Sequence, residues 1–309
     1  MFKSLIIYNM SEDLSITEED LNKQMPALAF KPCGSQDLKS TGWVAPLNGS
    51  PELFFAANGH ILLHIKTEEK ILPAGVIKDY HLEKIEQFEE REGRKCKKTE
   101  KDTLKDEVIH ELLPRAFSKF NIVPIWINPA KKMIMVEAGS SKKAEDALAL
   151  LRKTLGSLPV TPFTTESPIE YTLTEWVRDS KPAEGFVVLD EAELKAVLDE
   201  GGVIQSKKQD LASDEIQNHI EAGKFVTKLA LDWQGKITFL ITNDGLLKRI
   251  KLGDAITSQS DDIDKDDYAQ KFASDFTLAT GELSQMISDI VLAFNSPEDG
   301  KEETDSDSE

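Results

Sequence analysis

The sequence predicts an α+β protein, with mixed sheets, packed helices and one helical insertion that projects from a sheet. Three observations predict this class: strand-like apolar runs occur in groups, segments with helical periodicity separate the groups, and no regular strand-helix-strand alternation connects them. With 309 residues, of which 40% are hydrophobic, the chain can bury a substantial core. Its length favours two or three domains.

The first part of the chain is predicted to form a sheet with one covering helix. A strand is expected first, then a helix that Thr17 would cap, because Asp20 follows it three positions later. A hairpin turned by Asn58-Gly59 comes next, since this dipeptide is the strongest short hairpin signal. The expected ranges are 3–9 for the strand, 21–30 for the helix, and 53–57 and 60–65 for the hairpin strands.

After Pro73 the hydrophobic pattern changes to the period of a helix. Apolar residues recur at helical spacing up to Gly93, which interrupts the pattern, and the pattern resumes at Leu104 and ends before Pro114. This predicts a projecting antiparallel pair of helices. Strand-like segments return afterwards, so the pair is interpreted as an insertion in the sheet domain. These returning strands are expected at 117–120, 123–127 and 133–138.

The remaining part is predicted to alternate between helices and a meander. Ser141 would cap a helix that ends at Gly156, and Asp190 with Glu193 resembles a capping box and predicts another helix. The other expected elements are a short helix around Trp176, strands at 186–189 and 203–206, a helix from Ser213 to 222, meander strands at 225–231, 237–242 and 246–250, and a helix at 268–294.

Four regions follow from these elements. Prolines and threonines at 159–168 indicate a boundary, and the last residues are rich in serine, threonine and acids, as in disordered tails. The predicted regions are a central α/β sheet domain (1–73 and 120–165), a helical tip insertion (74–119), a C-terminal α+β base domain (166–295) and a disordered acidic tail (296–309).

The negative charge is uneven along the chain. The formal net charge is -18, and residues 297–309 and 261–267 contribute about half of it. DNA is repelled at long range by an acidic protein, so a DNA-binding protein of this composition must gather its positive charge on one face or in one cavity.

Motifs for catalysis are missing from the sequence. Neither the phosphate-binding loop nor the dinucleotide fingerprint occurs. His110 begins a partial zinc-protease motif, but Pro114 stands where the second histidine is needed. Residues 262–266 resemble the start of a calcium loop that lacks its glycine and its bidentate glutamate, and Cys33 and Cys96 are too few for a zinc cluster. We therefore expect no metal, no cofactor and no enzymatic activity.

The sequence also predicts a cytoplasmic protein. The apolar run at residues 2–10 is too short and too interrupted for a signal peptide. No stretch approaches the ~20 apolar residues that span a membrane, so no membrane partner is expected.

Residues 91–105 form a basic stripe with seven basic residues and three acidic ones, so their net charge is positive in a chain that is negative as a whole. If it is helical, Lys97, Lys101 and Lys105 fall on one face, with Lys98 and Arg94 beside them. Such a row fits a phosphate backbone, although a solvated face balanced by nearby acids is the alternative. Three further basic clusters favour DNA: Arg115 with Lys119, Lys142 with Lys143, and Lys207 and Lys208 beside Gln209. Because lysine dominates, backbone binding with little sequence preference is expected.

Aromatic and basic residues alternate in the segment PRAFSKF, which begins at Pro114. Phe120 is interpreted as a core residue of a strand. Phe117 could instead be an exposed contact at a subunit interface. Stacking of single-stranded DNA bases on these rings also remains open.

Long segments of the chain resemble the RdgC family of bacterial recombination-associated proteins. The resemblance covers nearly the whole length, and only the sequence after Asn295 departs from the family. Matching segments include KPCGSQD from Lys31, TGWVAP from Thr41, ELLPRAFSKF from Glu111, SKKAEDALALLRKTLGSLPV from Ser141 and TKLALDW from Thr227.

This resemblance implies a homodimeric ring, closed by two separate contacts, with a positively charged hole that encloses duplex DNA. The helical insertion would be the tip that closes one gate, with Phe117 at the contact. The residues implied to face or approach the hole are Arg94, Lys97, Lys98, Arg115, Lys208 and Gln209. The resemblance further implies nonspecific DNA binding in the nucleoid, which limits access of the RecA recombinase and supports replication-fork repair.

Two other functions are weighed against this one. An acidic adaptor could mimic DNA and bind a recombinase directly, using residues 261–267 and the tail. A hydrolase or nuclease is the third possibility, but no ligand set supports it.

Overall fold

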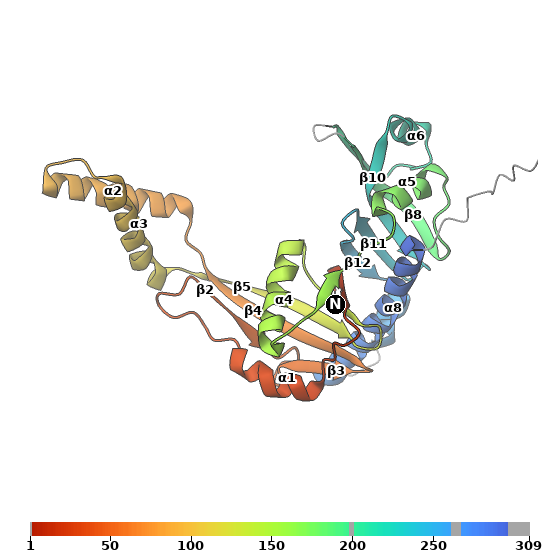
Figure 1. The fold of residues 1–309 in the computed structure, drawn as a ribbon, viewed down its shortest axis with the longest axis horizontal. Coiled ribbons are helices and arrows are strands. Elements are labelled where there is room, and N and C mark those ends of the chain that lie inside the picture. Colours follow the sequence, from red (N-terminus) through yellow and green to blue (C-terminus); the bar gives the residue numbers. More distant parts are fainter. Residues whose placement is uncertain (1, 198–200, 261–266, 296–309) are drawn as a thin grey trace, which may run out of the picture.

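We describe the chain from a computed structural model, which covers residues 2–197, 201–260 and 267–295; these form an α+β fold around one bent sheet (Figure 1). The strands are β1 (Ser4–Met10), β2 (Lys39–Val44), β3 (Phe54–Ala57), β4 (His60–Lys70), β5 (Ser118–Asn128), β6 (Met133–Val136), β7 (Val160–Pro162), β8 (Phe186–Ala196), β9 (Val203–Lys207), β10 (Lys224–Trp233), β11 (Ile237–Thr242) and β12 (Leu247–Leu252). The helices are α1 (Glu18–Gln24), α2 (Ala74–Glu92), α3 (Lys98–Leu112), α4 (Ser141–Leu155), α5 (Ile169–Arg178), α6 (Asp214–Glu221), α7 (Asp254–Thr257) and α8 (Tyr268–Asn295), with short 3-10 helices η1 (Met25–Leu28), η2 (Leu113–Arg115) and η3 (Ser258–Ser260).

The strands follow one another in the order β2-β4-β5-β6-β1-β12-β11-β10-β8-β9, with β3 beside β4 and β7 beside β1. Every pairing between these named strands is antiparallel. The expectation of mixed sheets is therefore wrong for the described residues. Part of the physical reason is that β3 and β4, β5 and β6, β8 and β9, and β10 to β12 follow one another through short connections, whereas parallel neighbours need a long crossover.

The predicted hairpin at Asn58-Gly59 is confirmed. Both residues have positive φ, +50° and +76°, as the turn between β3 and β4 requires. The meander of β10, β11 and β12 is also confirmed, and Gln234-Gly235 turns its first hairpin with φ values of +53° and +66°.

One predicted helix is wrong. The segment that begins at Asp190 and Glu193 continues as strand β8, although it carries a capping-box pattern. It pairs with β10 on one side and β9 on the other, and this pairing buries Ala192 and Leu194. Tertiary pairing therefore overrides the local capping signal. Likewise, the two strands expected at 117–120 and 123–127 are one strand, β5, because β4 pairs with it along its whole length.

Other helix boundaries agree closely with the pattern. Thr17 Oγ1 accepts a hydrogen bond from the backbone N–H of Asp20 at 3.2 Å, so it caps α1 as predicted. The cap of α4 is Ser140 rather than Ser141. The last helix, α8, extends one residue beyond the predicted end, to Asn295. Neither α8 nor any other helix of the described residues has the length and apolar character needed to cross a membrane.

The two faces of the sheet carry different helices. Trp43, Leu63 and Ile125 point to the face covered by α1, η1 and α4, where the Trp43 indole donates a hydrogen bond to Thr154 at 2.9 Å. Leu62 and Trp126, one position along their strands, point to the opposite face, where α5 and α8 pack. This alternation follows from the two-residue period of a strand. Helix α4 therefore marks one face of the sheet and α8 marks the other.

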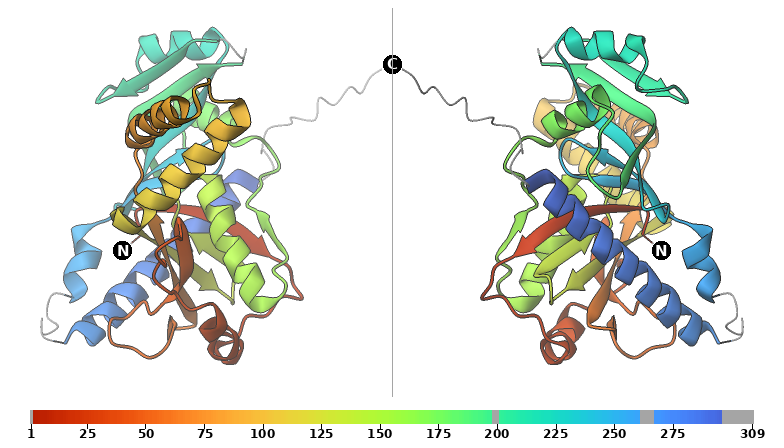
Figure 2. Two further views of the ribbon diagram at one scale, coloured as in Figure 1. Left: turned by 90° about the vertical axis from the view of Figure 1, so that its left-hand side faces the viewer. Right: turned by 90° about the vertical axis from the view of Figure 1, so that its right-hand side faces the viewer.

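Helix α8 links the two arms of the bent sheet. In Figure 2 it runs diagonally across the strands. Asn128 and Lys131, from the N-terminal arm, bind Ser284 at 3.0 and 2.8 Å, and the Trp233 indole, from the C-terminal arm, binds Asp289 at 2.9 Å. Both arms thus share the apolar core beneath α8. The predicted domain boundaries stay predictions.

Helices α2 and α3 form an antiparallel hairpin that projects beyond the sheet between β4 and β5 (Figure 1). Gly93 ends α2 in the left-handed conformation, with φ of +64°, which a glycine adopts without strain. Lys84 on α2 joins the helices by ion pairs to Glu111 and Glu107 on α3. No residue of α2 is buried, so polar contacts contribute much of the stabilisation that holds the two helices together.

His64 is expected to make the stability of the fold depend on pH. It lies between Val44 and Pro124 in the sheet, and burial lowers its pKa from 6.5 to about 4. The unfolded chain therefore binds more protons below pH 6.5, so the free energy of unfolding should fall as the pH falls from 6.5 to about 4, by up to about 3 kcal/mol. Urea unfolding at stepped pH measures this. His64→Leu should remove this component, whereas exposed His110→Leu should keep it; equal curves for His64→Leu and the parent would contradict the prediction.

Candidate nucleic-acid interface

The predicted stripe on α3 is helical and exposed. Lys97 is the N-cap of α3, and Lys98, Lys101 and Lys105 follow within the helix. All four side chains are exposed, and within the described residues none of them forms an ion pair. These four lysines are therefore open to an external anion.

Arg94, which was predicted beside this stripe, is already held by a carboxylate. Its guanidinium donates two hydrogen bonds to Glu100, at 2.9 and 2.6 Å, and lies 5.4 Å from the ring centre of Phe88. These bonds, together with the backbone N–H of Lys97 at 2.8 Å, lower the pKa of Glu100 to about 2. Arg94 therefore helps to close the turn between α2 and α3, and only its remaining donors face solvent.

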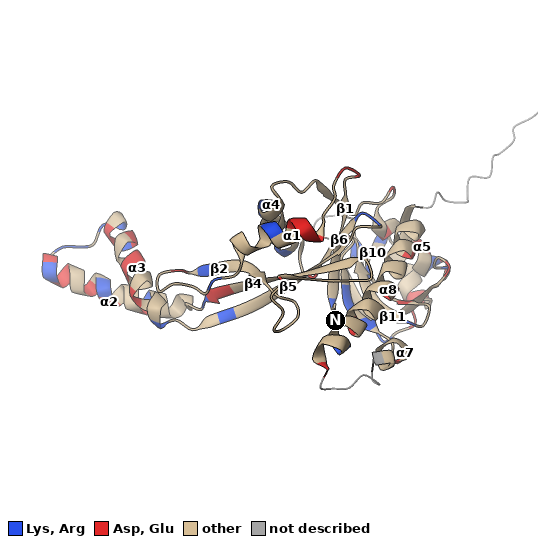
Figure 3. Cartoon of the chain, turned by 90° about the horizontal axis from the view of Figure 1, so that it is seen from below, with Lys and Arg blue, Asp and Glu red and all other residues tan. Residues whose placement is uncertain are grey.

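The helical hairpin is not uniformly basic. Figure 3 shows lysine or arginine and aspartate or glutamate alternating along α2 and α3. The stripe is thus one local feature of a mixed surface, and any DNA contact by the tip needs support from other elements.

A second basic group lies where the hairpin joins the sheet. Lys119 on β5 and Lys39 on β2 stand on either side of Glu69 on β4, in one row across three strands. Lys39 and Trp43 are four residues apart on β2, so this row is on the α4 face of the sheet. Arg115 is exposed just before β5, in η2. Two cations thus flank one carboxylate on this face.

Phe117 and Phe120 are both exposed, at 84% and 55%. The interpretation of Phe120 as a core residue is wrong, because the first part of β5 extends beyond the covering helices; Ile122 beside it is 51% exposed. Lys66 lies 4.8 Å from the Phe120 ring centre. Phe117 remains the predicted interface residue, and its exposure is what an interface with a second chain requires.

The third predicted group is in the C-terminal arm, at the end of β9. Lys207 is 3.8 Å from Glu191, and the side-chain amide of Gln209 donates to Glu215 at 2.8 Å. Lys208 has a positive φ of +57° and is exposed, and within the described residues it forms no ion pair. Of this group, Lys208 is the most available cation.

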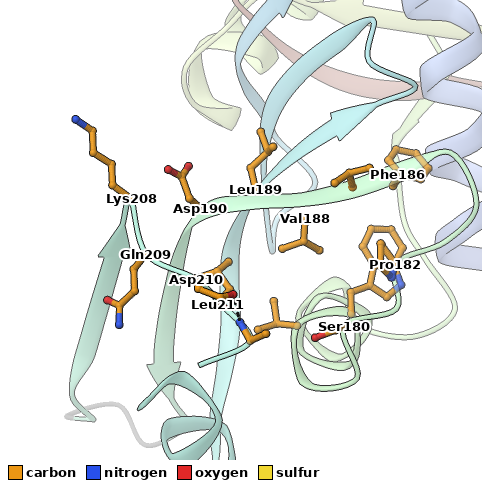
Figure 4. Close-up of a pocket in the computed structure, with 14 residues that line it drawn as sticks. Ser180, Pro182, Phe186, Val188, Leu189, Asp190, Lys208, Gln209, Asp210 and Leu211 are labelled. Atoms are coloured by element: carbon orange, nitrogen blue, oxygen red, sulfur yellow. Dashed lines mark hydrogen bonds between the residues drawn. The ribbon is translucent and has the colours of Figure 1, made fainter. Parts of the chain in front are cut away.

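Lys208 and Gln209 also border a cavity of about 510 Å³ (Figure 4). The wall of this cavity combines an apolar part from α5 and β8 with polar residues at the end of β8 and in the segment that follows β9. Figure 4 shows Lys208 extending from the mouth of the cavity rather than into it. The lining includes Trp176, Phe186, Val188, Asp190, Asp210 and Leu211.

A basic pair on β12, Lys248 and Lys251, was not predicted from the sequence. Lys248 pairs with Leu240 of β11, and Lys251 pairs with Thr238 of the same strand. Because Thr238 and Leu240 are two residues apart, they point to the same face of the sheet. Lys248 and Lys251 therefore also share that face, although they are three residues apart in the sequence. A β-bulge at Arg249, which has φ of +51°, makes this possible. Lys248 also pairs with Ser4 of β1, on the same face as Ile6 under α4. The segment LKRIKL was the only signal, and the bulge cannot be read from it.

The structure places some predicted lysines and the unpredicted pair of β12 on the same side of the sheet. Lys119, Lys248 and Lys251 are on the α4 face of the sheet, and exposed Lys142 and Lys143 are on α4 itself. Figure 1 shows α4 between two arms that rise on the same side of the molecule. The stripe of α3 lies in one arm and Lys207 to Gln209 lie in the other. We call five lysines, two on α4 and three on the face of the sheet that α4 covers, the concave basic surface: Lys119, Lys142, Lys143, Lys248 and Lys251.

Metal chemistry finds no support in the part of the chain that the structure describes. There, no three histidine, cysteine, aspartate or glutamate residues are grouped so that they could hold a metal ion. The predicted calcium-like acids fall at 262–266, outside the described residues, as does the acidic tail.

Comparison with known proteins places this geometry in a family. The family model described as "Putative exonuclease, RdgC" matches residues 1–296. The chain is 56% identical, over 291 residues, to the recombination-associated protein RdgC of Enterobacter sp. (strain 638), covering 94% of this chain and 96% of that relative. It is 55% identical, over 294 residues, to the protein of the same name from Serratia proteamaculans (strain 568), covering 95% and 97%.

Proposed function

This chain belongs to the RdgC family, and on that premise we propose that it binds double-stranded DNA without sequence preference during recombination. The observation that carries the proposal is the concave basic surface, where an acidic chain gathers lysines between two arms. Lysine is a point charge that attracts phosphate without reading bases, so little sequence preference is expected. The lysines of α3 and Lys208 extend the same chemistry toward the ends of the arms.

The proposal includes a homodimeric ring around the duplex. The two arms give one chain the shape of a half ring, and Phe117 supplies an exposed apolar group on the tip arm. Two copies related by a two-fold axis would turn both concave basic surfaces toward one hole and add their fields there.

Occupation of duplex DNA would limit RecA by competition. A protein that covers DNA of any sequence removes sites from a recombinase without touching it, and we propose this action on nucleoid DNA in the cytoplasm, including at replication forks. The acidic-adaptor hypothesis relies on residues 261–267 and 296–309, nearly all of which lie outside the described residues. A pull-down of RecA without DNA separates the two: retention of RecA would favour the adaptor.

Salt dependence is the direct test of the proposed binding. We expect the logarithm of the affinity for duplex DNA to fall linearly with the logarithm of salt concentration, with a slope of about -0.9 per phosphate contacted. Fluorescence anisotropy with two duplexes of unrelated sequence measures this, and the two slopes should agree. A flat response would contradict the proposal. Parallel samples with Mg²⁺ and with EDTA test for shortening of the duplex, which would support a nuclease instead.

Ring closure has its own test. Light scattering should give twice the chain mass, and linear duplex should bind better than covalently closed circular duplex of equal length when the ring must thread over an end. A strict monomer would remove the ring from the proposal while leaving DNA binding intact.

A further inference from the structure

We propose that the acidic segment 296–309 binds back onto the basic rim of the C-terminal arm and competes there with DNA. The base rim is defined as Lys181, Lys207 and Lys208. This regulation rests on the proposed DNA-binding function, because it acts on one of the same surfaces.

The segment has the chemistry of an electrostatic competitor. Residues 297–309 include seven acidic side chains and one lysine, and no aromatic or large aliphatic residue. Such a sequence cannot fill the apolar cavity, but it can follow a row of cations as a phosphate backbone does. The family model ends at residue 296, so residues 297–309 are not part of the matched family region.

The segment starts beside a wall of the cavity that the base rim borders. The ring of Phe294, at the end of α8, lies 5.3 Å from the ring of Trp176, and Asn295 accepts a hydrogen bond from the backbone N–H of Glu166 at 3.2 Å. Trp176 is also a wall of the cavity that Lys208 borders, together with Ser180 and Pro182. One aromatic side chain therefore separates the end of α8 from the cavity below the rim.

Reach and local concentration favour intramolecular binding. Fourteen residues follow Asn295, and an extended chain of that length spans up to roughly 45 Å. A tether of this length gives an effective concentration on the order of millimolar. Weak contacts between the segment and the rim can therefore compete with DNA.

The rim lysines are available to an acidic partner. In the described part of the chain, Lys181 and Lys208 form no ion pair, and both are exposed. Lys207 is 3.8 Å from Glu191, a carboxylate that Arg249 already binds at 2.9 Å.

Nearby acids limit where the segment can bind. Asp190 and Asp210 line the cavity and would repel carboxylates. Figure 4 shows Lys208 directed away from the apolar wall, so its ammonium group can be neutralised from outside without entering the cavity. Binding is thus confined to the rim.

The primary experiment is a double-mutant cycle on DNA affinity. Truncation after Asn295 should tighten binding of duplex DNA about fivefold to tenfold at low salt. It should also steepen the salt slope by about one to two units, because the freed lysines then release counterions when DNA binds. In the Lys207→Gln/Lys208→Gln background, truncation should change affinity less than twofold. In the matched Lys142→Gln/Lys143→Gln background, the full effect of truncation should persist.

The outcomes separate the regulation from the proposed function. If full-length and truncated chains both bind DNA equally, the regulation is wrong and the DNA binding stands. If neither binds DNA, the proposed function itself fails. An equal effect of truncation in both lysine backgrounds would mean general charge repulsion and would overturn the docking.

A chemical measurement tests the contact without DNA. Carbodiimide coupling of the full-length protein, followed by mass spectrometry, should join carboxylates of residues 298–309 to Lys181, Lys207 or Lys208. A mixture of isotope-labelled and unlabelled chains shows which copy supplies the segment. Links within one chain support the proposal; links only between copies, or links spread over lysines elsewhere, would overturn it.

Discussion

Replacing Lys248 and Lys251 by glutamate should weaken duplex binding about tenfold to a hundredfold near 0.1 M salt, equally for every sequence. Both lysines point to the concave side only because the bulge at Arg249 restores their alignment. Each charge that leaves a phosphate contact should also reduce the salt slope by about one unit. Anisotropy titrations at several salt concentrations measure both quantities.

A matched variant separates local contact from net charge. The double variant Lys31→Glu/Lys271→Glu makes the same change in charge on the opposite face of the sheet. Lys31 lies near Cys33, whose backbone N–H donates a hydrogen bond to Glu68 on that face. Lys271 is on α8, which covers the same face. We expect this variant to change affinity less than threefold. Equal weakening by both variants would show that total charge, and not the concave basic surface, governs binding.

Replacing Phe276 by alanine should lower the free energy of unfolding by about 3 to 5 kcal/mol. The Phe276 side chain is fully buried on α8, and its ring meets that of Phe55 edge-on at 5.5 Å. Its removal leaves a cavity beneath the helix that connects the two arms. Urea unfolding followed by tryptophan fluorescence measures the loss.

The control for this change is on the same helix. Gln285 is exposed, so Gln285→Ala should alter the free energy of unfolding by less than about 0.5 kcal/mol. Under conditions where both variants are fully folded, DNA affinity should match that of the parent. A loss below 1 kcal/mol for Phe276→Ala would mean that α8 contributes little to joining the arms.

Local signals predicted much of the fold. Thr17 caps α1 and Asn58-Gly59 turns a hairpin because each depends on backbone geometry within four residues. The helical period likewise located α3, and the exposed lysines of its stripe could be selected from spacing alone. In these cases the information is contained in neighbouring residues.

Elsewhere, contacts with strands or helices far away in the sequence made predictions from local patterns wrong. Asp190 and Glu193 carry a helix-capping pattern, yet β9 and β10 hold the segment as a strand. Phe120 has the character of a core residue, but its part of β5 extends beyond the helices that could cover it. Arg94 stays a predicted DNA-facing residue, and the structure adds that Glu100, six residues along the chain, binds its guanidinium.

The sequence by itself determined that this chain is an α+β member of its family, with a helical insertion and basic clusters in an acidic background. Only the tertiary structure decided that the strands form one antiparallel sheet and that Lys119, Lys248 and Lys251 lie on its α4 face. The physical reason is that a side chain in a strand points to one face or the other according to register, and a single bulge reverses that choice. Register and bulges are set by partner strands far away in the chain.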